Sequence, residues 1–253
     1  GAESHYIDSG PYMMVSSDLR IDEFKYEGSA LGNWELGGVY LPGEAKDHHL
    51  DAYIRHDGEE IAHLGGIYLP AEEGTGSLSA DIAFEHFPLN VANPFVPDRM
   101  VELDGDIDGT LSMKGDPAKP LLNGELALDS VTFFMPEMSA MFRFDNEPVQ
   151  VVNSKMMFKE FDIFTKGKTP FTINGEVDFS DLERTAVNLK MHAENYELLN
   201  APRTKRAMVY GKMYVDFNAT LRGPVEELVM RGNMNILGKT NVTYVLKDSP
   251  LTV

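Results

Sequence analysis

The acidic segment Asp104–Gly109 carries aspartate at alternate positions and ends in glycine. Alternating oxygen ligands with glycine at the sixth position begin a calcium-binding loop, which also needs a bidentate Glu at position twelve. That position is Gly115, which offers no ligand side chain. The same aspartates alternate with the apolar Leu103, Ile107 and Leu111, a period of two that is typical of a β-strand. We therefore predict a strand here and no calcium site.

Four histidines lie close together in the sequence: His48, His49, His56 and His63. Imidazole nitrogens bind zinc, but zinc sites combine such residues at tight, fixed spacing with further ligands. In a strand His48 and His49 would point to opposite faces, and the seven-residue gaps to His56 and His63 fit no common zinc motif. The sequence predicts that these histidines lie at a solvated edge. No metal or other cofactor is expected.

Nucleophilic catalysis has no sequence signature in this chain. Ser77 and Ser79 lack a Gly-x-Ser-x-Gly elbow, no glycine-rich loop leads into a helix, and cysteine is absent. The carboxylates fall on polar strand faces, where solvated charge is the ordinary explanation, although a carboxylate pair acting as acid and base stays open. We expect a binding protein and not an enzyme. A carbohydrate-directed enzyme is the least favoured function.

The composition narrows the range of partners. The chain has 253 residues, of which 43% are hydrophobic, and a formal net charge of −18. This acidity disfavours nucleic acid, whose phosphates it would repel, but an apolar groove can bind lipid without a basic patch. No apolar run approaches the ~18 residues of a membrane-spanning helix. Gly1 is typical of a residue left by tag removal, and 242–253 still has a strand pattern, so we expect a piece of a longer chain.

Alternation of apolar and polar residues is the main structural signal, and it is clearest in 171–179, 187–193 and 212–222. A period of two places the apolar set on one face, and such strands separated by Gly, Pro, Asn and Asp indicate an all-β antiparallel fold. Single helical turns are expected only at 181–184 and 196–200. The apolar residues of these strands are the candidate groove residues: Phe171, Ile173, Val177, Phe179, Val187, Leu189, Met191, Met213, Val215, Phe217 and Leu221.

Internal repeats indicate stacked units. Leu36–Pro42 recurs as Leu64–Pro70, and the glycine and proline pattern of 115–128 recurs in 223–236. Units that repeat at this scale bury their apolar faces only by stacking on one another.

We divide the chain into N-terminal repeats, 1–97, and C-terminal repeats, 98–253, and expect one continuous sheet across both. About fifteen strands spaced by ~4.8 Å would extend over roughly 70 Å.

The segment 109–128 also carries a resemblance to a known family. Its pattern, Gly-Thr-Leu followed by Gly-x-Pro-x-x-Pro-x-Leu-x-Gly-x-Leu-x-Leu, resembles the C-terminal domain of the TamB family. TamB is the inner-membrane subunit of the translocation and assembly module of diderm bacteria, and it is related to the AsmA-like proteins. The copy in 220–236 is similar but lacks a proline matching Pro120, and 170–177 and 240–246 also resemble the family. The resemblance runs from about residue 64 onward and is weaker before it.

This resemblance implies an elongated sheet that is curled lengthwise into a trough with an apolar interior, often described as a β-taco. It also implies a periplasmic location, with an inner-membrane anchor outside this chain and an outer-membrane assembly protein of the Omp85 type as partner. The family is associated with phospholipid transport and with outer-membrane protein insertion. We therefore expect a groove for lipid acyl chains, or alternatively a scaffold or chaperone whose sheet edge pairs with outer-membrane protein strands.

Phenylalanine and methionine concentrate in 133–164. Together they form an adaptable surface for flexible apolar chains. The same residues would also suit the core of a closed β-sandwich, in which two sheet faces meet. Both architectures stay open at this point, and the family resemblance favours the trough.

Overall fold

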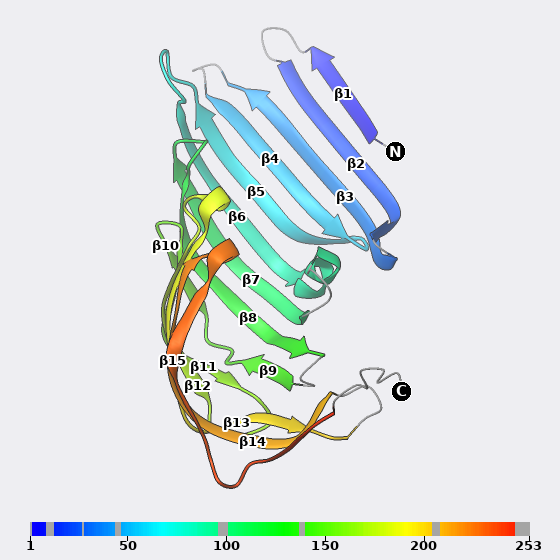
Figure 1. Ribbon diagram of the computed structural model, residues 1–253. Helices are drawn as coiled ribbons and strands as arrows, with labels where there is room; N and C mark the ends of the chain where they lie inside the picture. The colour runs from blue at the N-terminus through cyan, green and yellow to red at the C-terminus, as the bar shows by residue number, and fades with distance from the viewer. Residues whose placement is uncertain are drawn as a thin grey trace, which may run out of the picture.

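The chain forms one large antiparallel sheet that curls along its length (Figure 1). The computed structural model describes residues 2–8, 13–26, 28–43, 47–95, 101–136, 140–203 and 208–245. Strands make up nearly all the regular structure of these ranges, interrupted by three short 3-10 helices. The predicted all-β antiparallel fold is confirmed.

The strands are β1 Ala2–Asp8, β2 Met13–Tyr26, β3 Ser29–Pro42, β4 His48–His56, β5 Glu59–Leu69, β6 Ser77–Pro88, β7 Glu102–Gly115, β8 Leu121–Met135, β9 Ala140–Phe144, β10 Val149–Val152, β11 Lys155–Phe164, β12 Phe171–Asp178, β13 Ala186–Ala201, β14 Val209–Pro224, β15 Val229–Ile236 and β16 Asn241–Tyr244. The 3-10 helices are η1 Leu89–Phe95, η3 Leu182–Arg184 and η4 Val225–Glu227. The predicted turn at 181–184 is confirmed by η3, whereas 196–200, predicted as a second turn, continues β13.

Neighbouring strands in the sheet follow the chain from β1 to β8 and then from β10 to β15. The short β9 pairs with β8 and β11, and β16 pairs with the first half of β14, whose second half pairs with β15. The sheet is continuous between the two groups of repeats, because β6 pairs with β7 along most of its length. Hairpins between strands consecutive in the chain therefore build most of the sheet, as expected for stacked repeats.

The two faces of the sheet differ in polarity along its whole path. Residues that pair directly across adjacent strands point to the same face. One such row, here called the inner row, crosses eleven strands and contains only glycine and apolar residues: Gly38, Ala52, Leu64, Ile82, Leu111, Gly124, Val151, Met156, Val177, Val187 and Gly223. The adjacent row on the opposite, outer face is mostly polar: Gly37, Tyr53, His63, Ala83, Thr110, Glu125, Gln150, Met157, Glu176, Asn188 and Arg222.

β-Bulges recur in the sheet and bend its strands. In β2, β6, β11 and β13 two residues stand opposite one residue of the next strand, and the second of the two has a positive φ between 46° and 52°. Each pair is polar and points outward, between apolar residues that face inward. An extra outward residue lengthens the outer side of the strand, so the strand bends toward the inner face. The bulged pairs are Asp22-Glu23, Glu85-His86, Lys159-Glu160 and Glu194-Asn195.

An Asn or Asp side chain of the neighbouring strand satisfies the backbone N–H of each positive-φ residue. Asn33 Oδ1 accepts from Glu23 N at 2.9 Å, and Asp108 Oδ1 accepts from His86 N at 2.8 Å. Likewise, Asn174 Oδ1 accepts from Glu160 N at 2.8 Å and Asp216 Oδ1 from Asn195 N at 2.6 Å. The acceptor is in each case the single residue opposite the bulge, so Asp108 serves the bend of the sheet.

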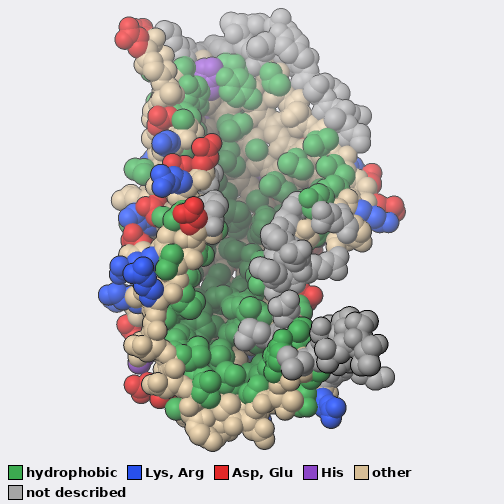
Figure 2. All heavy atoms as spheres, in the orientation of Figure 1, with side chains coloured by type: hydrophobic (Ala, Val, Ile, Leu, Met, Phe, Trp, Pro, Cys, Tyr) green, Lys and Arg blue, Asp and Glu red, His purple; other side chains and the backbone are tan. Residues whose placement is uncertain are grey.

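Part of the inner face is filled by the protein's own side chains. One cluster of buried residues joins β9 to β13 and comprises Ala140, Phe142, Val149, Phe161, Ile163, Ile173, Leu199 and Ala201. Phe133 stacks on Phe142 with 4.5 Å between ring centroids, and Phe144 and Phe161 continue the aromatic contacts. Elsewhere the inner face lines an open hollow (Figure 2). The fold is a curled trough that is packed in its C-terminal half, and the closed sandwich is not formed.

The bulge acceptors give a first test of this architecture. Asp216→Ala leaves the Asn195 N–H without its acceptor and should lower the free energy of unfolding by about 1 kcal/mol. Asp216→Asn keeps an acceptor oxygen and should restore most of that loss. Denaturant unfolding of both variants, with the outward-facing Asn188→Ala as control, checks this expectation. Equal stability of Asp216→Ala and the control would contradict the role assigned to Asp216.

Candidate functional site

The apolar hollow of the trough is a candidate surface for binding. In Figure 2 green hydrophobic side chains line it, while the charged side chains gather on the margins. The inner row contributes no charged or polar side chain from β3 to β14. Burying an unpaired charge against an apolar ligand is costly, so a lining free of charge is what an apolar chain requires.

Several lining residues are exposed although they point inward. Leu19 and Leu36, which pair across β2 and β3, are 41% and 40% exposed. At the other end of the sheet, Met230, Met234 and Ile236 of β15 are 63%, 56% and 62% exposed. These residues pair with inward-facing residues of β14, so they extend the lining. The accessible apolar surface therefore lies near both ends of the sheet.

The candidate groove residues predicted from the sequence all lie on strands β12 to β14, except Phe179, which follows β12. Their pairing places Ile173 beside Met191, Val177 beside Val187, and Leu189 beside Leu221. Phe171 pairs with Ala193, which pairs with Phe217; Tyr196 pairs with Val215, and Leu199 with Met213. The predicted register, with apolar residues on one face, is confirmed.

Burial divides these candidates into two groups. Ile173, Val187 and Val215 are 6%, 9% and 0% exposed, because side chains of the protein itself cover them. Phe171, Met191, Met213 and Phe217 are half-buried at the margins of the same clusters. A ligand in the hollow would meet the second group first. Their contact with lipid stays a prediction.

The phenylalanine and methionine run of 133–164 is divided between the two faces. The inward members pack in the aromatic cluster: Phe133, Met135, Phe142, Phe144, Met156, Phe158 and Phe161. Phe134 and Met141 pair with each other on the outer face, Met157 belongs to the outer row, and Phe164 lies under the guanidinium of Arg143. Met138 lies outside the described residues. The run therefore supplies a packed core as well as part of the lining.

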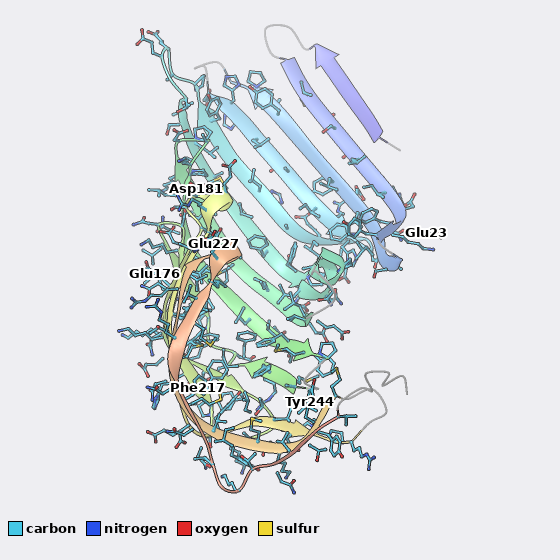
Figure 3. All side chains as sticks on the ribbon, in the orientation of Figure 1. Glu23, Glu176, Asp181, Phe217, Glu227 and Tyr244 are labelled. Carbon is cyan, nitrogen blue, oxygen red and sulfur yellow. The ribbon has the colours of Figure 1, made fainter. Side chains whose placement is uncertain are left out.

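Two loops border the hollow where β12 and β14 end. Asp181 and Glu227 are labelled in Figure 3: Asp181 caps the start of η3, and Glu227 is the last residue of η4. The two loops are joined by the hydrogen bond from Val225 N to Thr185 O at 3.0 Å. Beneath the β12–β13 loop is a recess of about 520 Å³. Its apolar walls come from Met113, Pro120, Leu122 and Phe179, and its polar residues are Lys119, Ser180, Asp181 and Glu183. Phe179 thus lines a recess at the rim.

The histidines do not lie at an edge of the sheet, so that part of the prediction is wrong, although the side chains of His49 and His63 are 50% and 43% exposed. His48 and His56 belong to β4, inside the sheet, and face inward, where their rings contact Tyr40 and Trp34 respectively. His49 points to the other face, as the strand geometry predicts. His63 belongs to β5 and faces outward. In the part of the chain that the structure describes, no three His, Asp or Glu side chains form a group that could hold a metal ion.

Sequence reasoning missed the exposed lining of β2, β3 and β15. The signal was present in the repeated heptapeptide, because Leu36, Gly38 and Tyr40 alternate on the inner face while a glycine pair masks the pattern. In β15, Met230, Gly232, Met234 and Ile236 alternate in the same way. In these segments Gly38 and Gly232 occupy inward strand positions without a side chain and are not turn residues. Counting them as such positions extends the period-two pattern through β3 and β15.

Comparison with protein-family models, curated proteins and solved structures gives no match to this chain. Within the described residues no helix has the length and apolar character needed to cross a membrane. The resemblance to the TamB family stays a prediction.

The outer face of β3 to β5 carries a dense polar network. Tyr53 donates to Glu35 at 3.0 Å, and this bond is the main reason that its pKa is raised to about 12. His63 lies between Glu60 and Asp51, with ring nitrogen to carboxylate distances of 2.9 and 3.1 Å. The hydrogen bond to Glu60, and next that to Asp51, raises the pKa of His63 above its ordinary value.

This raised pKa predicts a pH-dependent contribution to stability. Protonated His63 is favoured in the folded state, so its contribution is complete below the unfolded pKa of about 6.5 and is lost as pH rises through the folded value. The difference in unfolding free energy between wild type and His63→Gln should therefore be larger near pH ~6 than near pH ~9. Urea unfolding across this range measures it. A difference independent of pH would contradict the assignment.

Proposed function

We propose that this protein holds lipid acyl chains in its apolar trough and supports phospholipid transport or outer-membrane protein assembly between the two membranes of a Gram-negative envelope. The observation that carries the proposal is the inner row, in which eleven successive strands contribute only glycine and apolar residues. A path of this kind presents apolar contact along the stacked strands and no charge to be desolvated.

Open lining supports a transient apolar ligand better than a purely structural core. Leu19, Leu36, Met230, Met234 and Ile236 leave between 40% and 63% of their surface accessible on the inner face. An acyl chain covering such surface gains about 25 cal/mol per Å² of apolar area removed from water. Methionine adapts its side chain to flexible partners, which suits varied acyl chains.

The resemblance of 109–128 and 220–236 to the TamB family supports the envelope setting of the proposal. In that setting the chain would be a periplasmic part of a protein anchored in the inner membrane elsewhere. Its outer-membrane partner would be an assembly protein of the Omp85 type. The direct test is mass spectrometry of lipid that co-purifies with the native protein.

Two leucines of β3 provide a matched pair of variants for this proposal. Leu36 faces inward and is 40% exposed, whereas Leu41 faces outward and is 39% exposed. Leu36→Glu places a charge on the acyl-chain path and should reduce lipid transfer between vesicles about tenfold or more. Leu41→Glu changes the same residue type at equal exposure and should leave transfer unchanged. A fluorescent-phospholipid transfer assay measures both rates.

Both introduced glutamates are partly solvated, so the midpoint temperature of thermal unfolding should change by a similar amount in the two variants. That control separates an obstructed path from a damaged sheet. Equal lipid transfer rates for the two variants would contradict the acyl-chain proposal and would leave the edge of the sheet as the candidate binding surface.

A second candidate function, a scaffold that pairs with strands of another protein, is favoured by β15. All eight of its residues are exposed, and in the described chain it pairs only with β14. An unpaired strand edge is a template for β-augmentation. Proline lacks a backbone N–H. At a β15 position whose N–H points away from β14, a proline would therefore block pairing with another strand without removing a hydrogen bond to β14.

We therefore expect a proline scan over Arg231–Asn235 to yield folded variants at alternate positions. If the scaffold function holds, those folded variants should lose crosslinking to an outer-membrane protein substrate while retaining lipid transfer. Undiminished crosslinking in every folded variant would exclude the β15 edge as the pairing surface.

A further inference from the structure

The outer face of β12 to β15 carries a recess of about 540 Å³, on the side of the sheet opposite the trough. Four of its residues form one directly paired row, Asn174, Lys190, Thr220 and Arg231, one from each strand. Asn218 and His192 lie in the adjacent row. The recess therefore has its polar groups fixed by four strands and not by a loop.

Its amide groups present donors. Asn218 Oδ1 lies 2.6 Å from Nδ1 of His192, so its carbonyl oxygen is engaged and its NH2 group is the free end. Asn174 Oδ1 accepts from the bulged Glu160 N at 2.8 Å, which leaves its NH2 group free in the same way. The hydroxyl of Thr220 donates to the backbone oxygen of Arg231 at 3.4 Å. The recess thus offers two amide NH2 groups that have no hydrogen-bond acceptor among the residues that line it.

Its two cations have no carboxylate partner. Neither Lys190 nor Arg231 forms an ion pair within the described residues, although Lys155 on the same face bridges Glu176 at 3.0 Å and Asp178 at 3.7 Å. No aspartate or glutamate lines the recess. In a chain with a net charge of −18, this recess is lined by two cations and no carboxylate, although Asp162 accepts from the hydroxyl of its Thr172 at 2.7 Å and Glu194 lies 3.7 Å from its His192.

We propose that this recess binds an oxyanion, and specifically a phosphoryl group, over Thr220 between Lys190 and Arg231. The two cations stand two strands apart, about 10 Å at the backbone, so their long side chains converge from opposite sides on a group placed between them. Arginine binds phosphate oxygens through two parallel N–H donors, and lysine adds a point charge. The amide NH2 groups of Asn174 and Asn218 supply further donors to the remaining oxygens. The phosphoryl group can belong to a free phosphate or to a lipid headgroup.

The test uses the whole chain and two probes. Inorganic phosphate is titrated by nuclear magnetic resonance in chloride buffer, and vesicles of phosphatidylcholine with and without phosphatidic acid are tested by co-flotation. The variants are Lys190→Gln and Arg231→Gln, with Lys212→Gln as the control because it removes an outward-facing lysine of β14 away from the recess. Loss of one charge-assisted contact should weaken binding about tenfold in each recess variant, and the control should match wild type.

Phosphate binding that is lost in both recess variants supports the site, with free phosphate as a sufficient ligand. Flotation that requires phosphatidic acid and the same two residues, without binding of inorganic phosphate, also supports it and assigns the lipid headgroup as source. Equal weakening by Lys212→Gln would overturn the proposal, because general charge would then explain binding. Absence of binding to both probes by the folded wild-type protein would overturn it as well.

Discussion

A bent β-strand leaves a backbone N–H out of the ladder, and an unpaired N–H costs free energy unless another acceptor replaces the lost one. In this sheet the replacement is a carboxylate or amide oxygen of the next strand, at 2.6 to 2.9 Å from the bulged N–H in four places. The acceptor is the residue directly opposite the bulge, so one side chain both marks the bend and stabilises it. These four contacts stabilise bends that contribute to the curvature of the sheet, and with it to the hollow.

The same bulges preserve the polarity of the two faces. Because side chains alternate with a period of two, one extra residue would send every later apolar side chain to the outside. Here two polar residues stand between inward apolar residues, as in Phe84-Glu85-His86-Phe87 and Phe158-Lys159-Glu160-Phe161, and the bulge directs both polar residues outward. The apolar lining thus continues through the bend without interruption.

Period-two alternation is sufficient to predict the all-β fold, the antiparallel pairing and the inward set in β12 to β14. It is insufficient to predict burial, because alternation identifies the face of a residue and not what lies opposite that face: Val215 is fully covered, while Met234, on the same face, is 56% exposed. The predicted edge position of the histidines was wrong for a related reason. Whether a strand lies inside a sheet or at its edge depends on long-range pairing and not on local spacing. The apolar-polar-polar-apolar pattern of the bulges, in contrast, is local and could be recognised in a sequence alone.

Position in the sheet explains why some lining is covered and some is open. Strands β9 to β13 curl until their inward aromatic residues meet one another, which fills that part of the trough. Strands β2, β3 and β15 are near the two ends of the pairing order, and their inward-facing Leu19, Leu36, Met230, Met234 and Ile236 are 40% to 63% exposed. Their exposed apolar residues are therefore uncompensated in the isolated chain, and covering them releases free energy in proportion to area. An acyl chain covers this lining without forming backbone hydrogen bonds. A partner strand must in addition pair with the free backbone N–H and C=O groups at the edge of β15. This difference distinguishes the two proposed functions physically.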